Sequence, residues 1–271
     1  MLRVVLLGAG RVASQLAPAL HRAGHQVLSI WSRTANSADA LAATVPGAQV
    51  VRSLHLTAHA PADVYLLAVP DAAIPEILAQ AQFPAGALVA HTSGTVPLSV
   101  FKPYPNLRGG VFYPLQTFSP GRTVDWQAVP LCVEGATPVV EAVLLALGET
   151  ISGNVRRIGT PQRQAVHVAA VFACNFTNHL LGISETLLGR EHLPLALLAP
   201  LLQETVEKAL AYQPFTVQTG PAARHDTPTL NRHRSLLHAH PQWLEVYNVL
   251  TTSIQQQVPL ASRNNEATMK L

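Results

Sequence analysis

The stretch VVLLGAGRVA, residues 4–13, decides the fold expected for this chain. An apolar run ends at Gly8 and a helical pattern starts after Gly10, so the glycines lie in a strand-to-helix turn. In such a turn the first glycine permits the bend, the second lets a pyrophosphate approach the backbone, and Ala13 keeps the helix close to the sheet. Free N–H groups at the helix start favour an anion. The turn predicts a dinucleotide-binding Rossmann domain, with the cofactor held by Gly8, Ala9, Gly10, Arg11 and Val12.

The end of the second predicted strand selects the nucleotide. An acidic side chain about 20 residues beyond the glycines binds the ribose 2′-hydroxyl of NAD, whereas an arginine accommodates a 2′-phosphate. This chain has no Asp or Glu before Asp39, and the strand ends in Ser32-Arg33-Thr34. We therefore expect NADP(H), with Arg33 on the phosphate and Ser32 and Thr34 as hydroxyl donors. The missing acid also argues against a methyltransferase that binds S-adenosylmethionine. The alternative interpretation of Arg33 is a surface arginine on a turn.

Short apolar runs alternate with helical patterns as far as residue 158, which is typical of a parallel sheet covered by helices. From residue 159 onward helical spacing takes over, through 162–189, 194–212, 226–239 and 241–256. We predict an α/β N-terminal Rossmann domain with a mostly parallel, doubly wound sheet at 1–158, followed by an all-α C-terminal domain at 159–271. The expected strands are Val4–Leu7, His25–Trp31, Ala48–Val51, Asp63–Val69, Ala87–Ala90, Val129–Val133 and Asn154–Ile158.

The carboxyl ends of the fourth and fifth strands should line the ligand crevice, as they do in open parallel sheets. Val69, Pro70 and Ser93 are candidates for contacting the cofactor, and His91 for contacting the substrate. Residues 110–119, GVFYPLQTFS, read as a loop rich in polar and aromatic groups. In this loop Tyr113 is a candidate acid and Gln116 a candidate substrate ligand. Aromatic packing beneath the loop is an equally good explanation of its composition.

Composition excludes several classes of protein. The chain of 271 residues is 48% hydrophobic and 12% charged with a net charge of +3, and it contains no run of like charges. We therefore expect a packed globular protein that binds neither nucleic acid nor membrane. Two cysteines are too few for a disulfide framework, so a cytoplasmic location fits best. No histidine cluster has the spacing and the additional ligands of a metal site, so no metal is expected.

Four phrases behind the glycine turn resemble one bacterial family. They are HTSGTVPLSVF at 91–101, GVFYPLQTFS at 110–119, AVFACNFTNHLLGISE at 170–185 and TGPAARHD at 219–226. Nearly the whole chain resembles proteins with a Rossmann-like domain followed by a DUF2520 domain, which are often labelled NADP oxidoreductases. This family is similar to the wider 6-phosphogluconate dehydrogenase-like group, which includes ketopantoate reductase. The resemblance implies dimerisation through the helical domain and implies no particular substrate.

The predicted helix at 162–189 corresponds to the helix on which that wider group typically places a catalytic lysine and, some turns later, an asparagine. This chain has no lysine there, and His167 takes a similar place. At 100° per residue Asn175 and Asn178 share a helix face with His167. We expect His167 to act as the general acid and the two asparagines to hold the substrate heteroatom. The alternative is that all three make hydrogen bonds between helices.

Arg224, in the segment before the predicted helix at 226–239, is a candidate anchor for a substrate carboxylate. Its alternative is an ion pair with Asp226 or Glu185. The leading hypothesis is an NADP(H)-dependent oxidoreductase that moves hydride to or from a small oxo, imino or hydroxy compound in a cleft between two domains. A non-catalytic NADP(H)-binding sensor or assembly module is a second hypothesis. A deazaflavin-linked NADP reductase, with Phe112, Tyr113 and Phe118 stacking on the deazaflavin, is a third.

Overall fold

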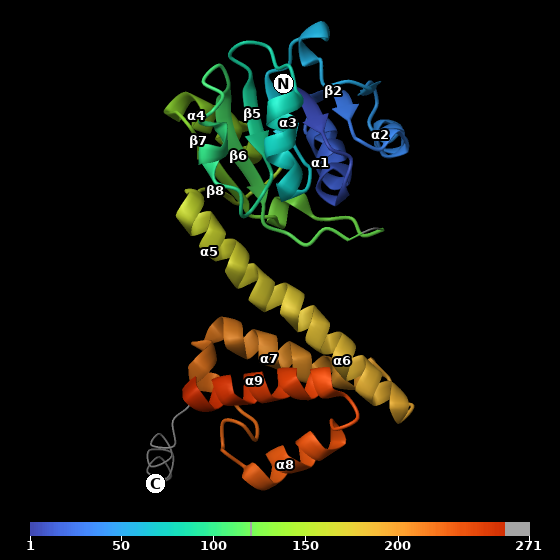
Figure 1. Ribbon diagram of the computed structural model, residues 1–271, viewed down its shortest axis with the longest axis vertical. Coiled ribbons are helices and arrows are strands. Elements are labelled where there is room, and N and C mark those ends of the chain that lie inside the picture. Colours follow the sequence, from blue (N-terminus) through green and yellow to red (C-terminus); the bar gives the residue numbers. More distant parts are fainter. Residues whose placement is uncertain (120, 258–271) are drawn as a thin grey trace. The chain divides into compact units, whose positions relative to one another are not determined.

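The N-terminal part of the chain folds around a single eight-stranded sheet (Figure 1). The computed structural model describes residues 1–119 and 121–257. The strand order is β3-β2-β1-β4-β5-β6-β7-β8, and every neighbouring pair is parallel except β6 and β7. The strands are β1 Arg3–Leu7, β2 Gln26–Trp31, β3 Gln49–Val51, β4 Val64–Leu67, β5 Leu88–His91, β6 Arg108–Pro114, β7 Leu131–Gly135 and β8 Val155–Arg157.

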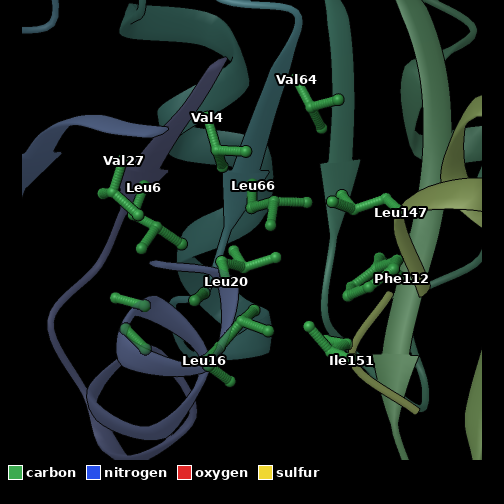
Figure 2. Close-up of a cluster of buried hydrophobic side chains, with 14 of the residues drawn as sticks. Val4, Leu6, Leu16, Leu20, Val27, Val64, Leu66, Phe112, Leu147 and Ile151 are labelled. Carbon is green, nitrogen blue, oxygen red and sulfur yellow. The ribbon is translucent and has the colours of Figure 1, made fainter. Parts of the chain in front are cut away.

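The strands bury side chains on both faces, because successive residues of a strand point to opposite sides. In β1, Val4 and Leu6 enter one hydrophobic cluster, while Val5 and Leu7 enter another. Figure 2 shows part of the first cluster, where Leu16 and Leu20 of α1 (Arg11–Arg22) and Leu147 of α4 (Pro138–Glu149) pack on the sheet. The second cluster is covered by α3 (Ile74–Gln80) and the 3₁₀ turn Leu98–Phe101. Helix α2 is Ala35–Ala42. The predicted doubly wound α/β domain is confirmed.

The prediction of a loop at 110–119 is wrong for its first half, because residues Arg108–Pro114 form strand β6. Two adjacent glycines obscure the strand in the sequence, since glycine weakens strand patterns. The fold requires the second of them: a Cβ on Gly110 would lie 2.5 Å from Cδ1 of Leu144 in α4. Phe112 is fully buried in the core, and Phe118 packs there against Trp126 with ring centroids 5.7 Å apart. Neither ring therefore offers the stacking face that the deazaflavin hypothesis needs.

From Thr160 onward the described chain consists of helices joined by turns, as predicted. The helices are α5 Thr160–Ala170, a π-helical segment Val171–Phe176, α6 Thr177–Arg190, α7 Ala199–Ala211, α8 Thr227–Leu236 and α9 Pro241–Gln257. Contacts divide the chain into compact units at Met1–Ala173 and Cys174–Leu271. This division assigns α5 to the unit that contains the sheet. The domain bounds expected from the sequence, 1–158 and 159–271, stay a prediction.

One helix in the described part of the chain, Thr160–Arg190, is long and apolar enough to span a membrane by length and composition alone. Its most apolar window has a mean hydropathy of 1.3. A single helix of this kind is weak evidence, because core helices of globular proteins meet the same criterion.

Candidate active site

The glycine turn has the conformation that dinucleotide binding requires. Gly8 has a φ of +118°, and a Cβ there would lie 2.7 Å from the carbonyl carbon of Ala68 in the neighbouring chain segment. Gly8 N donates to the carbonyl oxygen of Trp31 at 2.7 Å, which ties the turn to the end of β2. Gly10 is the N-cap of α1, which has no side-chain cap and no acidic residue in its first turn. The first amides of α1 are therefore available to an anion.

Eight of the predicted cofactor residues line one hollow of about 190 Å³, between the ends of β1, β2 and β4. These are Gly8, Ala9, Gly10, Ser32, Arg33, Thr34, Val69 and Pro70. Arg33 is exposed, and no ion pair joins it to a carboxylate in the part of the chain that the structure describes. Ser37 lines the same hollow and was missed from the sequence, although its place in the first turn of α2 is compatible with phosphate contact.

Arg11 lies in a neighbouring hollow of about 290 Å³ together with Ala9, Gly10, Ser14 and Ser119. The spacing of Ser14 three residues after Arg11 could have identified it, since both then lie on one helix face. No pattern in the sequence identified Ser119, which lies in the segment after β6. Val12 is half-buried and packs against the core.

His91 ends β5 and Ser93 follows in the next turn, and both side chains are buried. The Ser93 hydroxyl accepts hydrogen bonds from the backbone N–H groups of Thr95 and Val96, both at 3.0 Å, so it holds the turn. His91 is fully buried, and its Nδ1 accepts a hydrogen bond from Ser93 N at 3.2 Å. Burial, with the nearby Arg163 cation, lowers the pKa of His91 to about 3. Direct contact between His91 and a substrate would therefore require this turn to move.

Two predicted acids meet in the first unit. The hydroxyl of Tyr113, in β6, and Nδ1 of His167, in α5, are hydrogen-bonded at 3.0 Å. The two rings stand edge to face, with centroids 6.0 Å apart. Burial, with a contribution from the neighbouring Cys132 thiol, raises the pKa of Tyr113 to about 12. The phenol therefore keeps its proton at neutral pH, and the pair can supply a proton to a bound molecule.

Asn175, Asn178 and Arg224 belong to the second unit and are exposed. The predicted shared face of His167 with the two asparagines assumed an uninterrupted α-helix. That assumption is wrong, because residues Val171–Phe176 are π-helical and change the angle per residue. Gln116 is exposed, and its Oε1 accepts a hydrogen bond from Thr117 N at 2.7 Å, so it lies in the loop after β6.

The segment before α8 is ordered by its own side chains. Asp226 caps α8 by accepting a hydrogen bond from Thr229 N at 3.2 Å. The side chain of Thr229, together with this backbone hydrogen bond, lowers the pKa of the Asp226 carboxyl group. No ion pair involves Arg224 among residues 1–119 and 121–257. Within those residues no group of three or more His, Cys, Asp or Glu side chains could hold a metal ion.

Comparison with known proteins agrees with this geometry. Two family models match, a Rossmann-like domain over residues 1–115 and a domain of unknown function, DUF2520, over residues 129–254. A Bacteroides fragilis protein with the provisional name NADP oxidoreductase is 36% identical, with a TM-score of 0.86 over 94% of this chain and 98% of its own. The chain belongs to the family that joins these two domains. No curated protein matches it significantly.

Two solved proteins with the same fold contain a nicotinamide cofactor. A reductive aminase from Aspergillus terreus, in complex with NADPH and ethyl levulinate, is 15% identical, with a TM-score of 0.71 over 95% of each chain. An imine reductase from Myxococcus stipitatus, in complex with NADP⁺, is 16% identical, with a TM-score of 0.66 over 94% of each chain. At these identities the likeness shows the fold alone.

Proposed function

We propose that this protein is an NADP(H)-dependent oxidoreductase that transfers hydride to or from a small oxo, imino or hydroxy compound. The observation that carries the proposal is the hollow in which the uncapped start of α1 meets Ser32, Arg33 and Thr34. The amides of α1 suit a pyrophosphate, and the exposed Arg33 guanidinium suits a 2′-phosphate. The solved neighbours that contain NADPH or NADP⁺ support the same choice of cofactor.

The cofactor, when bound, would supply the hydride, and side chains of the protein would donate or accept the accompanying proton. In the direction of reduction, the Tyr113 hydroxyl donates its proton to the substrate oxygen or nitrogen. His167 Nδ1 shares a hydrogen bond with that hydroxyl, so His167 can restore the proton. Asn175, Asn178, Arg224 and Gln116 are the candidates for holding the substrate.

The first experiment is a fluorescence titration of the purified protein with NADPH and NADH. We expect NADPH to bind more tightly than NADH, and Arg33→Ala to weaken NADPH binding by about 10- to 100-fold, the value of one charge-assisted hydrogen-bonded contact. Binding of NADH should not change. The control is Arg108→Ala, because Arg108 lies at the other end of the sheet, where Nε donates to the Gly86 carbonyl oxygen at 2.6 Å. Equal weakening of both cofactors, or of neither, would contradict the assignment of Arg33.

The second experiment tests catalysis. The protein is incubated with NADPH and a panel of 2-oxo acids, ketones and cyclic imines, and nicotinamide oxidation is followed by absorbance. For any compound that is reduced, Tyr113→Phe and His167→Ala should lower kcat by about 10²- to 10⁴-fold, as expected for loss of a general acid, while the Kd of NADPH is unchanged. Tyr104→Phe serves as the control, because Tyr104 packs against the second hydrophobic cluster and lines neither cofactor hollow. Normal turnover in both variants would rule out the proposed acid, and NADPH binding without any turnover would favour the sensor hypothesis.

We also propose that the protein is a cytoplasmic homodimer formed through its second unit. Leu201 and Leu210 of α7 are 64% and 84% exposed, and their separation of nine residues puts them on opposite sides of the helix. A helix that is apolar on opposite faces needs cover on both, which a second copy of the chain would supply. Both cysteines are free thiols, in keeping with a reducing compartment.

A further inference from the structure

Arg163, near the start of α5, is a fully buried cation that neither the proton transfer nor the cofactor uses. Its NH1 group donates to three backbone carbonyl oxygens of the turn after β5, those of Ser93 at 3.1 Å, Gly94 at 3.2 Å and Val96 at 2.9 Å. Burying a cation is costly unless it is fully engaged, so this arrangement needs a reason. A planar guanidinium can bridge several acceptors in this way, whereas a lysine ammonium is a point charge on a flexible stem.

The other side of the same guanidinium holds the beginning of α5. Its NH2 group lies 3.1 Å from Oε2 of Glu134 in β7 and 3.2 Å from the hydroxyl of Thr160, the first residue of α5. That hydroxyl in turn lies 2.8 Å from Oε2 of Glu134. Arg163 thus joins three elements: the turn after β5, strand β7 and helix α5.

The turn that Arg163 holds is pressed against the Tyr113–His167 pair. A Cβ on Gly94 would lie 2.5 Å from Nδ1 of His167 and 2.9 Å from Cζ of Tyr113, so the two rings contact the glycine backbone directly. A second bond, from Gln164 Nε2 to the carbonyl oxygen of Thr95 at 2.8 Å, ties α5 to the same turn. Any displacement of this turn or of α5 would therefore open the space around the pair.

We propose that Arg163 is a positioning residue for the proton-donating pair: it locks the 93–96 turn to α5, so that Gly94 closes over the hydrogen bond between Tyr113 and His167 and excludes water from it. The catalytic meaning of this lock rests on the proposed function, but the lock itself is a property of the protein without cofactor or substrate. It also means that the pair is assembled wholly within the first unit.

The charges around Tyr113 allow the lock to be separated from a simple charge effect. Burial, Cys132 and Asp71 raise the pKa of the Tyr113 phenol, while the Arg163 cation lowers it. In Arg163→Lys the three-element bridge is lost, and near pH 11 the lysine, with an ordinary pKa of about 10.4, is mostly neutral as well. If Arg163 acted through its charge alone, this variant would raise the pKa of Tyr113, because the Arg163 cation lowers it. If Arg163 holds the site closed, water enters and the pKa of Tyr113 falls from about 12 toward the ordinary 10.0.

The test is NMR of protein labelled with ¹³Cζ-tyrosine, without cofactor, with the Tyr113 signal assigned from its absence in Tyr113→Phe. Near pH 11, midway between those values, we expect Tyr113 to be mostly protonated in the wild-type protein and mostly ionised in Arg163→Lys. Gly94→Ala, which keeps Arg163 and forces the turn off the pair, should give the same result. If circular dichroism shows that Arg163→Lys does not fold, the Tyr113 signal of Gly94→Ala becomes the test of the proposal.

Two control variants separate positioning from general destabilisation. Arg157→Lys changes an exposed arginine paired with Glu141 at 3.1 Å, and Leu144→Ala weakens the core beneath α4. Both should keep the wild-type Tyr113 signal. The proposal would be overturned if Arg163→Lys folds and its Tyr113 remains protonated near pH 11. If Arg163→Lys does not fold, the same result in a folded Gly94→Ala would overturn it. The NADPH titration is independent, so failure to bind the cofactor would refute the proposed function and leave this result intact.

Discussion

Three glycines serve different purposes at the scale of single residues. Gly8 is needed for its positive φ and for the carbonyl of Ala68, Gly94 for the approach of His167, and Gly110 for the side chain of Leu144. Only the purpose of Gly8 could be predicted, because it lies in a local pattern of spaced glycines. The neighbours of Gly94 and Gly110 come from helices 73 and 34 residues away in the chain, which no local pattern encodes.

The lowered pKa of His91 predicts that the folded protein loses stability in acid. Its pKa is 6.5 in an unfolded chain and about 3 in the fold, so the folded state favours neutral histidine. The resulting stability is fully present above pH 6.5 and is lost as the pH falls toward 3. Between about pH 7 and pH 4 the wild-type protein should therefore lose about 2–3 kcal/mol more unfolding free energy in urea than His91→Asn, which keeps an acceptor for Ser93 N. Exposed His59→Asn should behave as the wild type, and equal losses in all three proteins would contradict the assignment.

At the scale of elements, β6 and α4 depend on each other. Strand β6 reverses the direction of pairing in the sheet, since its neighbour β7 is antiparallel to it. Helix α4 packs over both strands with Leu144 and Leu147 fully buried. Gly110 leaves the space that the Leu144 side chain fills, so it allows α4 to pack on β6. The same glycine weakens the strand pattern of β6 in the sequence, which is why this strand was not predicted.

Truncation of Leu144 should therefore be costly. We expect Leu144→Ala to lower the unfolding free energy by about 2–5 kcal/mol, because a buried leucine leaves both lost contacts and a cavity. Leu145→Ala, on the half-buried side of α4, should cost less than half as much. Chemical denaturation of the two variants measures the difference. Equal effects would show that α4 does not pack on β6 through Leu144.

At the scale of the whole molecule, the apolar side chains of α7 predict a dimer. Sedimentation equilibrium should give about twice the chain mass of 29.0 kDa for the wild-type protein. Leu201→Glu and Leu210→Glu should each shift it toward the monomer, since burying an unpaired carboxylate in an interface is unfavourable. Val139→Glu, at a 64% exposed position on α4 of the first unit, should leave the dimer intact. A wild-type protein that sediments as a monomer would contradict the proposal.

The sequence by itself determined the α/β class, the glycine turn, the arginine at the end of β2 and the change to helices near residue 159. These features are local: each depends on spacing within one strand, turn or helix, so the chain carries them without reference to distant residues. Only the tertiary structure decided that 108–114 is a core strand, that His91 is buried, that Tyr113 meets His167 and that Arg163 holds them. Those facts depend on side chains from separate elements filling the same space, and local spacing does not specify which distant elements will meet.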